Sequence, residues 1–213
     1  MPVKTSIYID GFNLYYGSLK ENPSFKWLDL NALFNRILKP HHDINHINYF
    51  TANISARNGD AGPPVRQQIY LQALQAYLPN LIIYRGHFLS STVTMRLAVP
   101  LGKQKYAKVI KTEEKGSDVN LAIHALNDAW SGKYECAVIV SNDSDLSEAM
   151  RIIKNELRKK IILITPGNPK TRPVSNQLKK WSTANFGIST ADLAACQLPC
   201  EIPGTNLKKP LTW

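Results

Sequence analysis

The sequence predicts an α/β fold with a mostly parallel sheet and helices on both of its faces. Two observations carry this prediction. Strand-like and helix-like patterns alternate along the 213 residues, as they do in folds built from strand–helix–strand units. The runs at 136–140 and 161–164 are apolar at every position, which is typical of strands buried on both faces of a parallel sheet. The length suits one domain with a sizeable core.

Five segments follow one another in the first third of the chain. Residues 5–9 are largely β-branched or aromatic and predict a strand. Apolar residues recur on one helical face over 29–38 and alternate over 44–54, which indicates a helix and then a strand. The segment 57–64 is rich in Gly and Pro and is assigned as a loop. A helix is expected after it, at 65–78.

The middle of the chain continues the alternation. A short strand is expected at 81–84, and extended segments over 86–111 indicate a hairpin whose turn lies near Pro100. Apolar residues at helical spacing predict an amphipathic helix at 118–130. That helix leads to the first fully apolar strand, and helical spacing resumes over 146–157.

The last part of the chain changes in composition. The second fully apolar strand is followed by a stretch that is richer in Pro, Asn and Lys, with one short helix expected at 176–184. We therefore divide the chain into a domain over residues 1–165 and a basic C-terminal extension over 166–213. The extension is expected to pack on the same domain.

The charge of the chain is distinctly basic. Lys and Arg number 26 against 16 Asp and Glu, a formal net charge of +10. Residues 151–180 alone contribute +8, from nine cations and one acid, and a second group of five lysines at 103–115 is partly offset by two glutamates. Such a balance favours a polyanionic partner, whether nucleic acid, an acidic membrane surface or an acidic protein. If that partner is a nucleic acid such as RNA, the candidates for contacting its phosphates in the first stretch are Arg158, Lys159, Lys179 and Lys180. The alternative is that this stretch is only a solvated face.

Other features of the composition indicate the cellular compartment of the protein. No apolar run approaches the roughly 18–20 residues of a membrane-spanning helix, and the first apolar segment is broken by Asp10, unlike a signal peptide. Three cysteines are too few, and odd in number, for a disulfide framework. We therefore expect a cytoplasmic protein that does not act on membranes. The sequence does not decide whether two copies of the chain form a homodimer.

Acidic residues stand at the ends of strand-like runs. Asp10 follows the first strand, Asp143 and Asp145 follow the strand at 136–140, and Asp118 opens the helix before that strand. In a parallel sheet these positions meet at the C-terminal edge, where α/β folds bind their ligands. Crowded carboxylates repel one another unless a cation neutralises them. Oxygen ligands without His or Cys suit Mg²⁺ or Mn²⁺.

Each acid also has a purely structural alternative. Asp143, Ser144 or Asp145 would cap the following helix, and Asp145 stands at capping-box spacing from Glu148. Asp118 would cap its own helix, and the Asp10 motif would be an ordinary turn. Because all of these acids coincide at predicted strand ends, we favour a shared site.

Three segments also carry a family pattern, namely YIDGFNL at 8–14, KGSDV at 115–119 and SNDSDL at 141–146. Their order and spacing resemble those of the NYN family, a branch of the PIN-like ribonucleases, over roughly residues 5–165. The resemblance implies a Rossmann-like sheet and metal-dependent RNA cleavage. It also implies that Asp10, Asp118 and Asp143 ligate the metal, that Asn13 lies beside the metal or the scissile phosphate, and that Asp145 is a further acid.

The sequence therefore favours an endoribonuclease that hydrolyses RNA phosphodiester bonds with Mg²⁺ or Mn²⁺, without another cofactor. Asn142 departs from the glycine that the family motif often has. Asn tolerates left-handed backbone better than most residues, so we expect altered loop geometry rather than loss of the acids. The alternative is a catalytically inactive PIN-like module that binds RNA or a protein. A phosphatase ranks low, because the Asp10 motif lacks the second Asp and following Thr of the haloacid-dehalogenase type.

The loop at 57–64 leaves its strand at the same edge of the predicted sheet, which places Arg57 and Arg66 beside the site as RNA ligands. We expect Arg66 in the first turn of its helix, where a cation opposes the helix dipole and a bound phosphate would offset that cost. The aromatic residues that follow the first motif are expected mostly in the core, with base stacking as the alternative for some of them.

Overall fold

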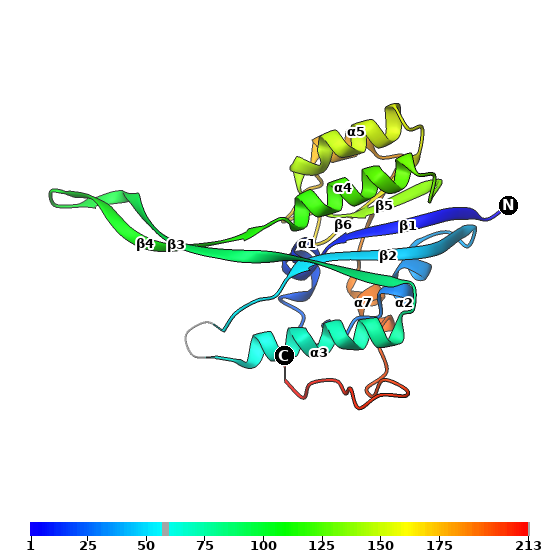
Figure 1. Ribbon diagram of the computed structural model, residues 1–213, viewed down its shortest axis with the longest axis horizontal. Coiled ribbons are helices and arrows are strands. Elements are labelled where there is room, and N and C mark those ends of the chain that lie inside the picture. The colour runs from blue at the N-terminus through cyan, green and yellow to red at the C-terminus, as the bar shows by residue number, and fades with distance from the viewer. Residues whose placement is uncertain (57–59, 213) are drawn as a thin grey trace.

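The computed structural model describes residues 1–56 and 60–212, and one seven-stranded sheet runs through it (Figure 1). The strand order is β4-β3-β2-β1-β5-β6-β7, and every neighbouring pair is parallel except β3 with β4. The predicted mostly parallel α/β fold is therefore confirmed. The strands are β1 (Val3–Asp10), β2 (His42–Ala52), β3 (Leu81–Leu101), β4 (Gln104–Lys115), β5 (Cys136–Val140), β6 (Lys160–Thr165) and β7 (Ala184–Gly187).

Helices connect the strands and cover both faces of the sheet (Figure 1). The α-helices are α1 (Gly11–Leu14), α2 (Leu30–Ile37), α3 (Gly62–Tyr77), α4 (Ser117–Trp130), α5 (Ser147–Asn155), α6 (Asn176–Trp181) and α7 (Thr190–Ala195). A π-helical turn at Tyr15–Leu19 and 3₁₀ turns at Pro23–Phe25 and Ser144–Leu146 complete the described helical structure.

Alternation along the strands divides the core into two layers. Ile7 and Ile9 of β1 pack with α2, α3 and α7, whereas Tyr8 between them packs with α4, α5 and α6. Successive side chains of a strand point to opposite faces, and β5 divides in the same way, with Val138 in the first layer and Ile139 in the second. The apolar runs identified in the sequence are thus buried on both faces.

The sheet has its topological switch point at β1. The chain passes from β1 to β2 and β3 on one side, and then returns as β5 on the other side of β1. The carboxyl ends of β1 and β5 therefore flank the position where open α/β sheets form ligand clefts. Asp10 is the last residue of β1, and Ser141 follows β5 directly.

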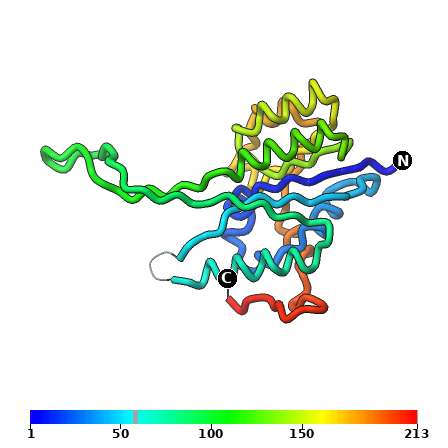
Figure 2. Tube along the Cα trace, in the orientation of Figure 1, coloured from blue at the N-terminus to red at the C-terminus, as the bar shows by residue number. Residues whose placement is uncertain are grey.

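The predicted hairpin is present and is much longer than a connecting loop. Strand β3 continues to Leu101, beyond the short strand expected at 81–84, and turns back at Gln104. Residues 87–115, which we call the arm, project from the body as a two-stranded ribbon (Figures 1 and 2). The backbone pairs run from His87 with Lys115 outward to Arg96 with Tyr106.

Helix α3 begins at Gly62 rather than at residue 65. Pro63 is the second helical residue, and the first-turn N–H groups of a helix have no partner within it, so a proline there costs no hydrogen bond. Pro63 therefore belongs to the helix and not to the loop. Arg66 consequently lies just beyond the first turn, not within it as expected. The dipole argument for a phosphate at Arg66 is weaker for that reason.

The segment after residue 165 contributes to the same sheet and core. Strand β7 pairs with β6, the indole of Trp27 donates to the carbonyl of Pro199 at 2.8 Å, and Leu193 and Leu198 are buried. The boundary at residue 165 and the separate C-terminal extension stay predictions. Within the described residues, no helix is long and apolar enough to cross a membrane.

Candidate active site

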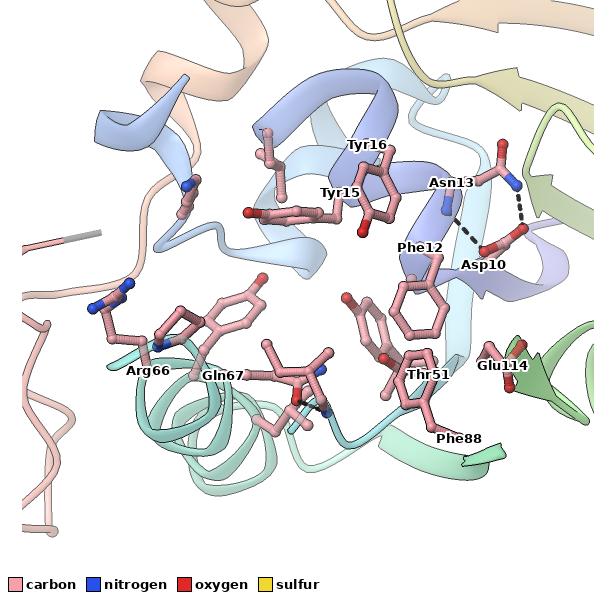
Figure 3. A pocket seen from close by; sticks show the side chains of 18 of the residues that line it. Asp10, Phe12, Asn13, Tyr15, Tyr16, Thr51, Arg66, Gln67, Phe88 and Glu114 are labelled. Atoms are coloured by element: carbon pink, nitrogen blue, oxygen red, sulfur yellow. Dashed lines mark hydrogen bonds between the residues drawn. The ribbon is translucent and has the colours of Figure 1, made fainter. Parts of the chain in front are cut away.

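A cavity of about 630 Å³ opens at the carboxyl ends of β1 and β2 (Figure 3). Asp10, Asn13, Asp118 and Asp143, four of the five predicted catalytic residues, line it. The fifth, Asp145, is exposed and does not line it. Acids from β1, from the junction of β4 with α4, and from the segment after β5 thus meet around one space. The lining also includes the acids Asp60 and Glu114, the cations Lys26 and Arg66, and the aromatic side chains of Phe12, Tyr15, Tyr16, Tyr49, Tyr70 and Phe88.

Asp10 is held rigidly at the end of β1. Its side chain is the N-cap of α1, with Oδ1 accepting from the backbone N–H of Asn13 at 2.9 Å. Its Oδ2 accepts from the Asn13 amide and from the Ser141 hydroxyl, the latter at 2.9 Å. Burial raises the pKa of Asp10, while these hydrogen bonds act in the opposite direction. Asp10 is thus a helix cap, a role not predicted from the sequence, and this capping fixes the carboxylate in place.

Gly11 explains why the chain can turn at once from β1 into α1. A Cβ atom at Gly11 would lie 2.8 Å from the carbonyl oxygen of Phe50 and 2.9 Å from the Tyr49 ring. Only glycine allows β2 to approach this closely. The motif is thus a direct strand-to-helix junction and not the ordinary turn that was the alternative.

Ser141 connects Asp10 to the segment that carries Asp143. Its hydroxyl donates to Asp10 and accepts from the backbone N–H of Asp143 at 3.0 Å. Asp143 in turn is the N-cap of the 3₁₀ turn, and its Oδ1 accepts from the N–H of Asp145 at 3.0 Å. Capping uses one oxygen of Asp143, and the residue still lines the cavity.

Asp118 is the acid with the most perturbed environment. The N-cap of α4 is Gly116 and not Asp118, so the capping alternative is wrong for this residue. Partial burial, and then repulsion from Asp10, Asp143, Glu114 and Asp145 in decreasing order, raises the pKa of Asp118 to about 6. Among the described residues, no donor hydrogen-bonds to its carboxylate. Asp145 likewise caps no helix, because the residue at the N-cap of α5 is Leu146.

Glu114 was not identified from the sequence. Its carboxylate accepts from the backbone N–H of Ser117 at 3.1 Å and from the Ser117 hydroxyl at 2.7 Å. The opposing backbone at Gly86 leaves the space for this carboxylate, since a Cβ atom there would collide with Oε1 of Glu114. The base of the arm thereby brings another acid to the cavity (Figure 3).

The donor set fits a hard divalent cation. Within the described part of the chain, no three His, Cys, Asp or Glu side chains converge closely enough to hold an ion by themselves. Mg²⁺ binds through one or two carboxylates plus waters and substrate phosphates, so it does not require such a cage. The repelled carboxylate of Asp118, without a hydrogen-bond partner among the described residues, and the free lone pairs of Asp143 are suitable ligands.

Asn13 is fixed from both ends of its amide. Its Nδ2 donates to Asp10, and its Oδ1 accepts from the guanidinium of Arg172 and from the N–H of Asn142, the latter at 3.3 Å. The structure therefore places Asn13 at the cavity wall as a support for Asp10. Arg172, which sequence reasoning missed, is the residue that holds this amide in its orientation.

Asn142 does not adopt the left-handed backbone that the sequence comparison with glycine suggested. The positive φ angle among the described non-glycine residues belongs to Arg158. Instead, the Asn142 amide donates to the carbonyl of Pro173 at 2.9 Å and accepts from the N–H of Ser175 at 2.8 Å. The side chain that replaces glycine therefore anchors the segment carrying Arg172.

The predicted RNA-binding residues lie in different places. Arg66 lines the cavity across from Asp10 (Figure 3), whereas Arg57 lies outside the described residues. Arg158 and Lys159 immediately precede the amino end of β6, at the edge of the sheet opposite the cavity. Lys179 and Lys180 end α6, just before the amino end of β7 at that same opposite edge. None of these last four residues lines the cavity.

Two exposed aromatic side chains form part of the cavity wall. Tyr15 and Tyr16 are 36% and 57% exposed as residues, and their rings pack edge to face with centroids 5.2 Å apart. The ammonium group of Lys26 lies 5.4 Å from the Tyr15 ring, and that of Lys20 lies 5.6 Å from the Tyr16 ring. Trp27, by contrast, is fully buried, and Phe25 packs partly buried against the core. The core position expected for most of these four aromatic residues is therefore found for only two of them.

Comparison with known proteins gives three results. Residues 4–181 match the family model described as the NYN domain. A relative from Pseudomonas putida, 6-hydroxy-3-succinoylpyridine 3-monooxygenase, is 34% identical over 239 aligned positions, which cover 100% of this chain and 76% of the relative. The crystal structure of a protein of unknown function from Vibrio parahaemolyticus superposes with a TM-score of 0.53 at 18% identity, over 92% of this chain and 97% of the other. That last likeness shows a shared fold alone.

Proposed function

Since the chain belongs to the NYN domain family, a family of PIN-like nucleases, we propose that it is an endoribonuclease that hydrolyses RNA phosphodiester bonds. Its cofactor is Mg²⁺ or Mn²⁺, held at the carboxylates of the cavity. One observation carries the proposal: Asp10, Asp118 and Asp143 come from three separate elements and line one cavity at the switch point of the sheet.

Each acid has a distinct part in the proposal. Asp10, Asp118 and Asp143 hold the metal ion, and Asn13 and Ser141 keep Asp10 in position through their hydrogen bonds. Asp145 adds negative charge near Asp118. When bound, the ion supplies Lewis-acid polarisation of the phosphate and makes water more acidic. In the metal-free protein the pKa of Asp118 is about 6, so metal binding below about that pH must release the proton from this carboxylate.

The remainder of the cavity suits a nucleotide chain. Tyr15 and Tyr16 offer exposed ring faces for stacking bases, and Lys26 and Arg66 offer charges for phosphates. We also propose that the enzyme acts in the cytoplasm. If the unmodified protein binds RNA but does not cleave it, the alternative of an inactive RNA- or protein-binding module is favoured instead.

A second candidate function comes from the named relative. Because the relative is 34% identical across this whole chain, hydroxylation of a pyridine ring is the competing proposal. The observation in its favour is that aromatic side chains and two cations line the same cavity, and such a lining also fits a flat aromatic acid. A monooxygenase consumes one O₂ and two electrons for each ring that it hydroxylates, so its activity is measured independently of RNA.

Two parallel incubations test these functions. In the first, single-stranded RNA is incubated with Mn²⁺ or with EDTA, using the unmodified protein, Asp118→Asn and the matched control Asp43→Asn. Asp43 is exposed near the amino end of β2, away from the cavity. We expect cleavage with Mn²⁺ by the unmodified protein and by the control, and loss of cleavage in EDTA and in Asp118→Asn.

In the second incubation, 6-hydroxy-3-succinoylpyridine is supplied with NADH, and oxygen consumption is followed. Substrate-dependent oxygen uptake without RNA cleavage would overturn the nuclease proposal. RNA binding without either reaction would assign the chain to the inactive binding modules.

A further inference from the structure

The arm has a charge distribution unlike that of the body. Residues 87–112 include five cations and no Asp or Glu. The innermost of them, Lys111, pairs with Glu113 at 2.6 Å, and the remaining four make no ion pair within the described residues. These four are Arg96, Lys103, Lys105 and Lys108. A two-stranded ribbon is at best marginally stable alone in water, so an arm of this length indicates a partner.

The register of the arm shows that one of its faces continues the cavity wall. Phe88 pairs with Glu114, and both line the cavity. Residues two apart along a strand share a face, and directly opposite residues point the same way. Farther out on that face, Thr94 therefore stands opposite Lys108, and Arg96 opposite Tyr106. Between Phe88 and Thr94 this face carries Ser90 opposite Thr112 and Thr92 opposite Ile110, so the row that leads from the acids out to Arg96 is polar and basic except for Ile110.

The other face of the arm is apolar beyond its three innermost pairs, His87 with Lys115, Leu89 with Glu113 and Ser91 with Lys111. Leu89, Val93, Met95 and Val109 share it by the same register, and Leu89 and Met95 are 54% and 48% exposed. Taken alone, this face would suit a second copy of the chain. Two copies, however, would bring together two arms whose residues 87–112 carry five cations and no acid, on proteins that each carry a charge of +10. Repulsion between them opposes that arrangement, whereas a polyanion neutralises the same charges.

We propose that the arm is a track for single-stranded RNA, which binds along the face of Thr94, Arg96, Tyr106 and Lys108 and enters the cavity past Phe88. The inference rests on the proposed endoribonuclease function and names the surface that delivers the substrate. Lys108 and Arg96 contact phosphates, and Tyr106, which is 58% exposed, stacks on a base. The basic residues at 158–180 that line no part of the cavity are not needed for this path.

The dimensions of the track give a length for the bound RNA. Arg96 lies eight residues beyond Phe88, which is about 26 Å at the strand rise of about 3.3 Å per residue. A stacked strand has one phosphate per about 3.4 Å, so the track accommodates about eight nucleotides, and fewer if the RNA is extended. Affinity should rise with RNA length until the track is filled and then level off.

The first test measures how binding depends on salt. RNA of about 12 nucleotides is titrated in EDTA, which prevents cleavage, against the unmodified protein and the double variant Arg96→Ser/Lys108→Ser. The slope of log affinity against log salt should become shallower by about 1.4, since each neutralised phosphate of a single strand contributes about 0.7. Lys4→Ser/Lys39→Ser removes the same charge from the opposite edge of the sheet and should leave the slope unchanged. Equal slopes for the two double variants would overturn the inference.

The second test removes the track without touching the cavity. Residues 92–110 are replaced by a two-residue Asn-Gly turn between Ser91 and Lys111, which face each other in the register. The shortened protein should cleave an RNA of about 4 nucleotides at the normal rate but lose the preference for longer RNA. A shortened protein that keeps this preference would contradict a track on the arm.

These outcomes separate the inference from the proposed function. If the unmodified protein cleaves RNA and both arm variants behave as it does, only the track is wrong. If the unmodified protein neither binds nor cleaves RNA, both proposals fail. The molar mass in solution, measured by light scattering, completes the comparison. A dimer that becomes a monomer when the arm is shortened, with RNA binding intact, would assign the arm to a second copy and overturn the track.

Discussion

Replacement of Asp118 by Asn should stabilise the metal-free protein at neutral pH. The rise of the pKa of Asp118 from its ordinary 3.8 to about 6 would correspond to about 3 kcal/mol for a fully buried group. Asp118 is only partly buried, so solvent screening reduces this to about 1.5 kcal/mol. Asn also loses a favourable charge in the first turn of α4, worth about 0.5 kcal/mol. The net gain is about 1 kcal/mol, or about 2–4 °C in melting temperature for a chain of this size.

The pH dependence of this gain has a definite sign. The folded protein binds a proton at Asp118 up to about pH 6, whereas the unfolded chain releases it near 3.8. The destabilisation by Asp118 therefore grows as the pH rises from about 4 to about 6, and it is complete above pH 6. Thermal melts in EDTA should show Asp118→Asn above the unmodified protein at pH 7.5, with a smaller difference, or none, near pH 4.

Two results would refute this reasoning. A variant that melts below the unmodified protein at pH 7.5 would show that the carboxylate is stabilising, as a structural cap is. A gain that does not change with pH would show that the effect does not come from the charge. Asp43→Asn, which removes an exposed carboxylate, should change the melting temperature little at either pH, because exposed substitutions have small effects.

Substitutions at three further positions test other parts of the site. Asp143→Asn keeps a capping oxygen, so the free energy of unfolding should stay nearly level while RNA cleavage falls by orders of magnitude. Asp143→Ala should also lower the free energy of unfolding, measured with denaturant, by about 1 kcal/mol. Arg66→Ala should weaken RNA binding or turnover at an unchanged melting temperature; unfolding with intact binding per folded molecule would make Arg66 structural. Arg172→Gln releases the Asn13 amide and should slow cleavage by about 10–100-fold at unchanged RNA affinity, and a normal rate would show that Asn13 needs no such support.

Patterns local in sequence predicted most of the fold. The fully apolar run at 136–140 has the same bounds as β5. A strand buried on both faces is apolar at every position, so it is recognised without an alternating pattern. The four-residue strand β7 was missed, since its sequence ANFG has neither an apolar run nor strand propensity at its ends. Its pairing with β6 determines its structure, and this pairing cannot be inferred from the short sequence of β7 itself.

The site was predictable where its residues follow strands. Asp10 and Asp143 lie at the carboxyl ends of β1 and β5, and topology brings such positions together. Glu114 belongs to the arm, and only the register of a long hairpin returns it to the cavity. Arg172 reaches Asn13 across 159 positions of the chain from a segment without regular structure, so nothing local indicates it.

The number of charges in a stretch of sequence did not indicate which basic residues lie near the cavity. The stretch 151–180 has the largest charge excess of the chain, but its candidates Arg158 and Lys159 lie at the opposite edge of the sheet from the acids. A helix such as α5 carries the chain from one edge of a parallel sheet to the other, so residues close in sequence reach different edges. Their role in RNA binding stays a prediction, and the arm places other cations nearer the cavity.

The most direct test of the account is RNA cleavage in ¹⁸O-labelled water with Mn²⁺, by the unmodified protein and by Asp143→Asn, with mass analysis of the new ends. Hydrolysis at a metal site forms a bond between water oxygen and phosphorus. We therefore predict ¹⁸O in the new phosphate ends from the unmodified protein, and cleavage slower by orders of magnitude in the variant. Near-normal cleavage by Asp143→Asn, or new ends that are cyclic phosphates without label, would contradict hydrolysis at these carboxylates.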